Sequence, residues 1–285
     1  MTTDSTCRCG ADHLGHEVGR GIRRAVKAES PDAYLLGEHF HDGTPHLQGD
    51  ELDASMNYRG FMFPVYEWLA GAEIPQAFKR GWAPARALPS DVLLEQWQEY
   101  LAAIPWAVAR QQFNLLGSHD TPRVLTVLHE DLRLLRIALT LLFTFPGVPS
   151  VYYGDEVGLL GGRDPDNRRC MPWDPSAWNS AVWHEYRETA RMRREHAALR
   201  RGAWQPLLGQ DDTLAFSRET ASERCLVVAC RGTTAPAIIP VRAAALADGV
   251  VLTEARTGAT STVCHGFLDV PGLASAGAQV WIAHP

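Results

Sequence analysis

The chain has no apolar run long enough to cross a lipid bilayer. Its most apolar stretch, residues 137–145, is followed at once by Pro146, whereas a spanning helix needs about 20 apolar residues. Residues 1–6 also lack the charged and then apolar order of a secretion signal. We therefore expect a cytoplasmic protein that has no membrane as a partner.

Metal-binding cysteine patterns and a basic excess are also missing. The six cysteines are too few for a disulfide scaffold in 285 residues, and their spacing fits no zinc or haem motif. Reduced thiols in a cytoplasm are the simplest explanation for Cys7, Cys9, Cys170, Cys225, Cys230 and Cys264. The formal net charge is −6, and no basic patch alternates with aromatic residues, which excludes nucleic acid as a partner.

What is present is an alternation of apolar strands and amphipathic helices up to about residue 202. Strands are expected at 33–40, 55–58, 113–117 and 148–154, and helices at 12–27, 61–70, 91–109, 131–144 and 181–201. This order predicts an α/β unit with a parallel sheet. Afterwards, short strands between Gly, Pro and Thr turns predict a small antiparallel β-domain, at 213–218, 225–231, 237–241, 250–254 and 279–283.

Two of the expected parallel strands end in acidic side chains. Glu38 follows Gly37 at the end of the first strand, and His119 and Asp120 follow the third. Carboxyl ends of parallel strands meet at one rim, where partial burial can raise a carboxyl pKa enough for acid catalysis. The alternatives are that Glu38 is a solvated loop carboxylate and that Asp120 caps the turn through Thr121.

Two carboxylates on one rim fit glycoside hydrolysis, in which one donates a proton and another stabilises an oxocarbenium-like centre. Paired acids also occur in metal sites, but no third acid or His lies at a ligand-like spacing, so we expect no metal and no cofactor. The loop at 161–174 mixes opposite charges with aromatics. It could clamp sugar hydroxyls or could pair its charges internally, and the residues alone do not decide between these interpretations.

Five segments resemble, in chain order, those of the α-amylase family, glycoside hydrolase family 13. Leu36–Asp42 resembles its general-acid region, and Ser55–Tyr58 its sixth strand in cyclomaltodextrinases and neopullulanase-like enzymes. Leu115–Thr121 resembles its fourth signature region, and Gly147–Gly158 its eighth-strand segment. Gly162–Asp174 resembles the following loop of the members that act on maltodextrins, maltodextrin glucosidase-like enzymes included.

The resemblance implies a role for each matching residue. Glu38 would be the general acid/base and Asp120 the transition-state stabiliser. His119, Asp164 and Arg168 would contact substrate, an α-glucan or maltooligosaccharide. Such enzymes cleave α-1,4 and sometimes α-1,6 glucosidic bonds with retention. Residues 1–202 would be the C-terminal half, strands 5–8, of a (β/α)8 catalytic barrel, and 203–285 a C-terminal antiparallel β-sandwich domain.

The chain departs from the family where the nucleophile should be. The family has a Gly-aromatic-Arg-apolar-Asp pattern, a few tens of residues before the general acid. Aligning Arg8 with that Arg puts Gly10 at the nucleophile position, and Asp12 is two residues out of register at the start of a helix. We therefore expect a truncated enzyme that lacks its nucleophile and has little or no activity, since such a loss costs many orders of magnitude.

Two other functions fit the same residues. A non-catalytic carbohydrate-binding or assembly subunit would keep the rim without the reaction. An α-glucosyl transferase would share the covalent intermediate with a hydrolase, so the sequence does not separate the two. A half barrel would also have open sheet edges and an exposed apolar inner face, which favours a homo-oligomer formed through those edges.

Overall fold

A computed structural model of the chain describes residues 15–69, 87–232, 238–271, 273 and 276–284. Four short parallel strands lie side by side in chain order, each hydrogen-bonded to the next. They are β1 (Leu36–His39), β2 (Ala54–Asn57), β3 (Phe113–Asn114) and β4 (Val148–Pro149). Because all four run in the same direction, their carboxyl ends lie at one edge of the sheet, as the alternating pattern predicts.

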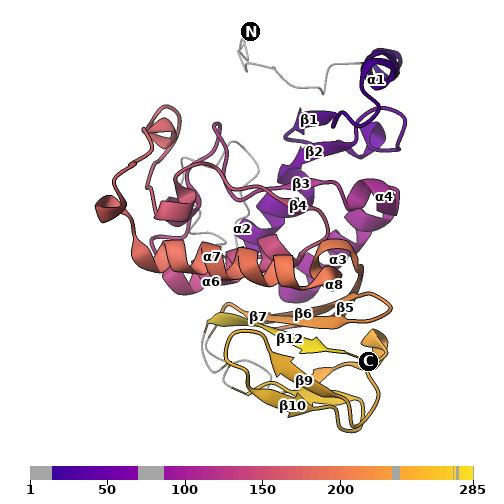
Figure 1. Cartoon of the computed structure of the whole chain (residues 1–285), viewed down its shortest axis with the longest axis vertical. Coiled ribbons are helices and arrows are strands. Elements are labelled where there is room, and N and C mark those ends of the chain that lie inside the picture. Colours follow the sequence, from indigo (N-terminus) through magenta and orange to yellow (C-terminus); the bar gives the residue numbers. More distant parts are fainter. Residues whose placement is uncertain (1–14, 70–86, 233–237, 272, 274–275, 285) are drawn as a thin grey trace.

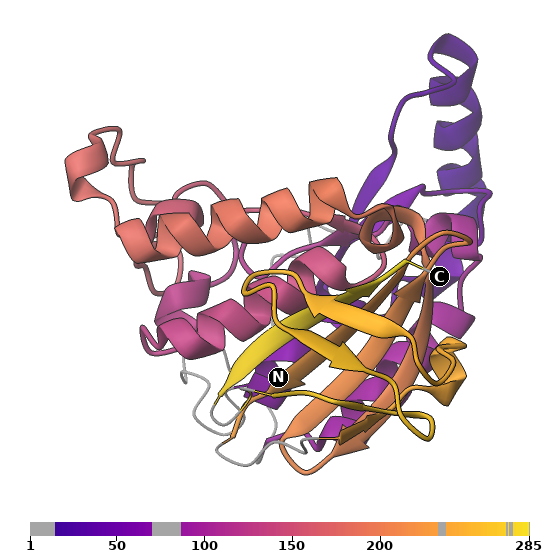
Figure 2. The same ribbon diagram turned by 60° about the horizontal axis from the view of Figure 1, so that its bottom comes forward.

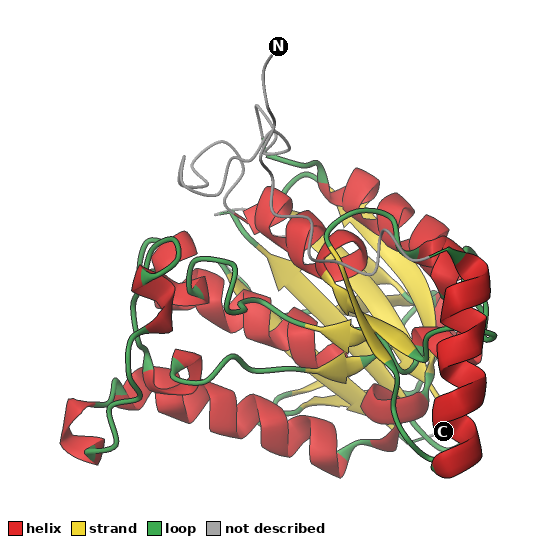
Figure 3. Cartoon of the chain, turned by 90° about the horizontal axis from the view of Figure 1, so that it is seen from above, coloured by secondary structure: helices red, strands yellow, loops and turns green. Residues whose placement is uncertain are grey.

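Helices connect and flank these strands (Figure 3). α1 precedes β1, α2 to α4 lie between β2 and β3, α5 and α6 between β3 and β4, and α7 and α8 follow β4. Their bounds are α1 His16–Glu29, α2 Phe63–Leu69, α3 Ser90–Ala102, α4 Trp106–Ala109, α5 Val124–Val127, α6 Leu132–Thr144, α7 Ser180–Glu195 and α8 Ala197–Arg201. Single turns lie at η2 Thr44–His46, η3 Tyr58–Met62, η6 Asp155–Val157, η7 Asp166–Arg168, η8 Pro175–Ala177 and η9 Arg242–Ala244.

The chain changes to antiparallel structure after Gly202. A six-stranded sheet has the order β10-β9-β12-β7-β6-β5, and β11 pairs with β8 in a second, two-stranded sheet. The strands are β5 Ala203–Gln210, β6 Thr213–Glu219, β7 Arg224–Cys230, β8 Ile238–Pro240, β9 Val251–Glu254, β10 Thr260–Thr262, β11 Phe267–Asp269 and β12 Gly277–Ala283. Figure 1 shows α6, α7 and α8 between this sheet and the parallel strands.

The antiparallel sheet buries both of its faces. Leu214 and Phe216 of β6 belong to the main core with α2, α3 and α6, whereas Ala215 between them packs toward Ile239 and Leu268 of the small sheet. This alternation follows from the two-residue period of a strand. The main core therefore runs without a break from the helices of the first part into β6, β7 and β12.

Helix α1 is attached differently from the other long helices. None of its residues is buried, and it projects from the remainder of the chain in Figure 2. Polar side chains hold it: Arg20 pairs with Asp50 at 2.6 Å, while Arg23 and Lys27 reach Asp53 at 2.8 and 2.9 Å. The helix predicted at 12–27 is thus present, and it ends at Glu29, two residues after the expected end. Residues 12–14 lie outside the described ranges.

Several expected elements have different bounds. The helix expected at 91–109 ends at Ala102, because the residue before Pro105 is disfavoured in helical geometry, and α4 begins only after that proline. Asp91 lies in the first turn of α3 and does not cap it, since Pro89 is the N-cap residue. The helix expected at 181–201 is divided at His196, whose backbone is extended.

The parallel strands are shorter than their apolar runs suggest. Residues 115–117 and 150–154 follow β3 and β4 outside the sheet ladder. The strands β5, β10 and β11 were not expected from the sequence. None of the helices within the described ranges combines the length and apolar composition that crossing a bilayer requires.

Candidate active site

The carboxyl ends of the parallel strands bring the predicted acidic residues together. Glu38 is on β1, and His119 and Asp120 follow β3 by five and six residues. One nitrogen or oxygen atom from each of the three side chains lies within 4.8 Å of the others. Residues about 80 positions apart in the sequence therefore share one small surface, as the strand-end pattern predicts.

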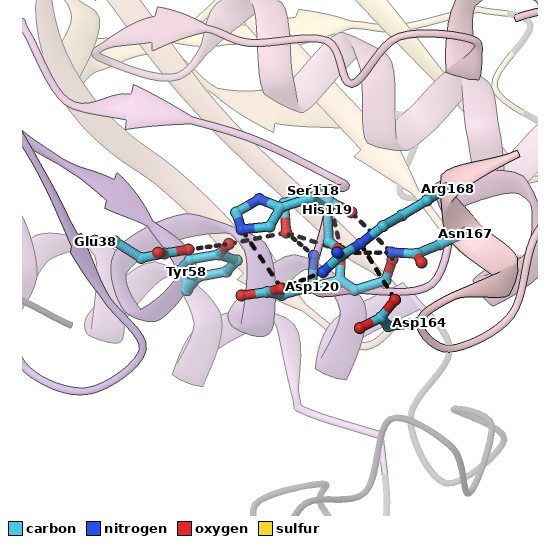
Figure 4. Close-up of polar contacts among 9 residues, drawn as sticks. Glu38, Tyr58, Ser118, His119, Asp120, Asp164, Asn167 and Arg168 are labelled. Carbon is cyan, nitrogen blue, oxygen red and sulfur yellow. Dashed lines mark hydrogen bonds and ion pairs between the residues drawn. The ribbon is translucent and has the colours of Figure 1, made fainter. Parts of the chain in front are cut away.

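Tyr58, the residue after β2, links Glu38 to Ser118, the residue before His119 (Figure 4). Its hydroxyl oxygen lies 2.9 Å from Ser118 Oγ and 3.4 Å from Glu38 Oε1. The ring is fully buried and stacks on Phe40 at 4.2 Å between centroids. Burial raises the pKa of Tyr58 well above its ordinary value, so the hydroxyl remains a donor toward the half-buried Glu38.

The loop after β4 reaches back over the His119–Asp120 turn. Arg168 Nη2 lies 3.1 Å from Asp120 Oδ1, and Arg168 Nε donates to the carbonyl of His119 at 2.9 Å. Asp164 lies 3.3 Å from the same Nε, and His119 Nε2 is 3.5 Å from Asp120 Oδ1. All four side chains are more than a third exposed, so water screens these pairs and the residues remain accessible to a ligand.

Asn167 holds the same turn from inside the protein. Its Nδ2 group donates to the carbonyls of Ser118, His119 and Thr121 at 3.2, 2.8 and 2.8 Å. The side chain is fully buried. Because three carbonyls of the turn point at one amide group, Asn167 fixes the backbone from which His119 and Asp120 project.

A buried ion pair supports the floor of the site. Arg123 is fully buried, and its Nη1 lies 2.9 Å from Asp155 Oδ1 and 2.6 Å from the carbonyl of Tyr153. Burial raises the pKa of Asp155 to about 7, although the adjacent guanidinium favours the ionised form. Gly117 passes directly over this carboxyl: a Cβ there would lie 2.8 Å from Asp155 Oδ2, so the strand end needs glycine at that position.

The charged loop combines both interpretations that the sequence left open. Its charges do pair internally, with Arg169 at 2.6 Å from Asp166 and Arg168 beside Asp164. Arg168 nevertheless also reaches Asp120, and the indole of Trp173 is 81% exposed. The loop thus contributes one charged side chain to the site and also carries an exposed aromatic side chain.

A model of the α-amylase catalytic domain matches residues 9–202. The chain belongs to the α-amylase family. It is 36% identical over 230 residues to a cyclomaltodextrinase of Geobacillus thermopakistaniensis, covering 80% of this chain and 37% of that protein. It is 34% identical to an intracellular maltogenic amylase of Bacillus subtilis, covering 76% and 35%. A solved cyclomaltodextrinase structure superposes with a TM-score of 0.81 at 32% identity, covering 95% of this chain and 44% of that one.

The chain spans between about a third and a half of the length of these relatives. The family resemblance read from the motifs is therefore confirmed. The segment with Arg8, Gly10 and Asp12 lies outside the residues that the structure describes.

Sequence reasoning missed Tyr58, Ser118 and Asn167, which contact residues of the candidate site or the backbone that carries them. Tyr58 was assigned to a strand, whereas it directly follows β2. Its place at the carboxyl end of a parallel strand could have indicated a site residue. Asn167 lies in the loop that was singled out, but no spacing rule indicates which backbone carbonyls an asparagine will contact.

The free cysteines among the described residues are Cys170, Cys225, Cys230 and Cys264.

Proposed function

We propose that this chain acts on α-glucans as a retaining α-amylase-family glycoside hydrolase, with Glu38 as general acid/base and Asp120 as transition-state stabiliser. The observation that supports it is the meeting of Glu38, His119 and Asp120 within 4.8 Å at the carboxyl ends of parallel strands. Residues 1–202 would correspond to strands 5–8 of the family barrel, and 203–285 to its C-terminal β-domain. A maltodextrin or cyclic maltooligosaccharide is the substrate class that the relatives' names suggest.

The two carboxylates would have different roles, because their surroundings differ. Glu38 is half-buried beside the Tyr58 hydroxyl, a position suited to delivering a proton to the leaving glycosidic oxygen. Asp120 lies beside Arg168, and a carboxylate there would stabilise the positive charge that develops at the anomeric carbon. His119, Asp164 and Arg168 would hold sugar hydroxyls around the cleaved bond.

The nucleophile is the separate question. With Gly10 where the family has an aspartate, we propose that the chain by itself turns over little substrate. The test is nitrophenol release from a nitrophenyl α-maltoside, with Glu38→Gln, Asp120→Asn and Asp12→Asn as matched variants. Activity lost in the first two would support the assignment. Additional loss in Asp12→Asn would make Asp12 the nucleophile and overturn the proposal of low turnover.

A non-catalytic sugar-binding role is the second candidate, and the exposed Trp173 favours it. An indole that is 81% exposed, in the same loop as Arg168, is a platform on which a sugar ring can stack. Calorimetric titration with maltoheptaose distinguishes the candidates. Saturable binding without turnover would select this role, and absence of binding would exclude both.

We also propose that the chain associates with a second copy through the edges of its parallel sheet. β1 and β4 are the edge strands, and Leu36 and Val148 on them are 40% and 45% exposed. Unpaired edges with apolar side chains favour strand pairing between chains. Val148→Lys should then lower the mass measured by light scattering, and an unchanged monomeric mass in both proteins would contradict the proposal. The intracellular relative makes an intracellular location our proposal as well.

A further inference from the structure

Behind β1, on the face opposite to Glu38, three imidazoles and a carboxylate lie together. Successive side chains of a strand point to opposite faces, so His39 leaves the candidate active site and stacks on His46, with ring centroids 5.1 Å apart. His16, the first residue of α1, lies against the other side of His46 at 4.7 Å. Glu51 completes the cluster.

Two of these imidazoles face the same carboxylate. His16 Nδ1 is 2.6 Å from Glu51 Oε1, and His46 Nδ1 is 2.8 Å from Glu51 Oε2. The Glu51 residue is only 2% exposed. Although burial opposes its ionisation, the hydrogen bonds from His46 and His16 outweigh that effect and lower the pKa of the Glu51 carboxyl. The cluster therefore offers a buried anion between two ring nitrogens.

The surrounding backbone holds these three side chains in place. Gly19 lies one helical turn after His16, and a Cβ there would clash with Glu51 Oε2, so glycine allows α1 to approach the carboxylate this closely. On the same side, Arg20 pairs with Asp50. These contacts fix the start of α1 against the segment that carries His46 and Glu51.

The basic side chains of α1 near the cluster form ion pairs with carboxylates other than Glu51. Arg20 pairs with Asp50, and Arg23 and Lys27 share Asp53. A divalent cation between the three ligand atoms would place positive charge beside the buried Glu51 carboxylate.

We propose that His16, His46 and Glu51 bind a divalent transition-metal ion of the Zn²⁺ class. Two imidazoles and a carboxylate are a known zinc ligand set, with bonds of about 2.0–2.2 Å and water in the fourth position. The three ligand atoms lie within 4.8 Å of one another, against about 3.3 Å in a tetrahedral site with such bonds. Small side-chain rotations therefore suffice to close the site.

Sequence spacing does not reveal this site, because His16 is 30 residues before His46. The expectation of no metal was based on the absence of a third acid or His at a ligand-like spacing beside the paired acids of the rim. The ion would tie α1, which has no buried residue, to the segment after β1. The proposal does not depend on sugar chemistry and concerns the opposite face of β1.

The test is calorimetric titration of the tag-free, EDTA-dialysed full chain with ZnCl2. All proteins would carry Cys7, Cys9, Cys170 and Cys264 as serine, because thiolates also bind zinc. We expect one saturable site and a rise in Tm of about 5 °C at a zinc concentration of about 100 Kd.

His16→Gln is the decisive variant, since His16 is half-exposed and a glutamine amide can still donate to Glu51, so Tm in EDTA should change little. It should weaken zinc binding about 10–100-fold, and Glu51→Gln at least as much. His184→Gln, an exposed histidine of α7, is the matched control and should bind like the parent. Absence of saturable binding, or equal affinity in His16→Gln and His184→Gln, would overturn the proposal.

Discussion

Replacing Asn167 tests how the candidate active site is held together. This buried amide donates to three carbonyls of the turn that carries His119 and Asp120. Two substitutions separate its contributions. Asn167→Ala removes the donor, and Asn167→Asp keeps the shape while replacing the donor group with an acceptor.

The magnitudes follow from the number of bonds. An amide group has two hydrogens, so three carbonyls receive at most two bonds of full strength. At about 0.5–1.5 kcal/mol net for each, Asn167→Ala should lower the free energy of unfolding by about 1–3 kcal/mol. Asn167→Asp should cost more near pH 8, about 3–5 kcal/mol, because a buried carboxylate would then face carbonyl oxygens without a partner.

The two variants should differ in pH dependence. Burial against carbonyls raises the native-state pKa of the introduced carboxyl above its unfolded value, and its protonated form can donate one hydrogen bond. Its stability contribution is therefore fully present below the unfolded pKa of about 3.9 and is lost as the pH rises through the native value. Asn167→Ala introduces no titratable group and should parallel the parent at every pH.

Urea unfolding from about pH 4 to 8 measures the global effect. Trypsin measures local opening, since the exposed Arg163, Arg168 and Arg169 flank Asn167 in the loop. We expect faster cleavage in Asn167→Asp at pH 8 than at a mildly acidic pH, after correction for trypsin's own pH dependence. Equal stability and equal cleavage of the two variants across the pH range would refute the assignment of Asn167 as the donor that fixes this turn.

Three further predictions concern other parts of the chain. Arg218→Met should lower the free energy of unfolding by about 3–5 kcal/mol in urea, because the buried guanidinium donates to the carbonyls of Thr144, Leu199 and Gly202. Asp53→Asn should weaken the acid limb of a urea stability–pH curve: hydrogen bonds and ion pairs outweigh burial and lower the pKa of Asp53, so its contribution exists above about pH 4 and is lost as the pH falls through the native value. Trp173→Ala should leave stability within about 0.5 kcal/mol and weaken maltoheptaose binding about three- to tenfold by calorimetry.

The strand-end pattern was the part of the site that the sequence could predict. An apolar run that ends in a small residue and an acid indicates a strand tip, and parallel strands bring their tips together. Glu38, His119 and Asp120 accordingly meet. Strand length was overestimated, because apolar residues after Asn114 and Pro149 are buried in part without pairing in the ladder.

Strand β5 shows why some elements escape a periodicity argument. Pro206 cannot donate to a ladder, the pairing with β6 shifts between Pro206 and Leu208, and most of its residues are half-buried on both faces. The sequence of an edge strand with a bulge therefore shows no two-residue alternation. Contacts such as those of Asn167 and Glu51 depend on how loops and helices dock, which local sequence does not encode.

The sheet topology changes from parallel to antiparallel after Gly202, but side-chain contacts connect the two parts of the chain. Arg218 of β6 binds the carbonyl ends of α6 and α8, and Arg256, which follows β9, reaches Glu185 at 2.7 Å and Thr189 at 2.8 Å on α7. Since α6 leads into β4 and α7 follows its loop, the antiparallel sheet braces the elements that present Arg168. The β-domain should therefore affect sugar binding at the rim without contacting the sugar itself.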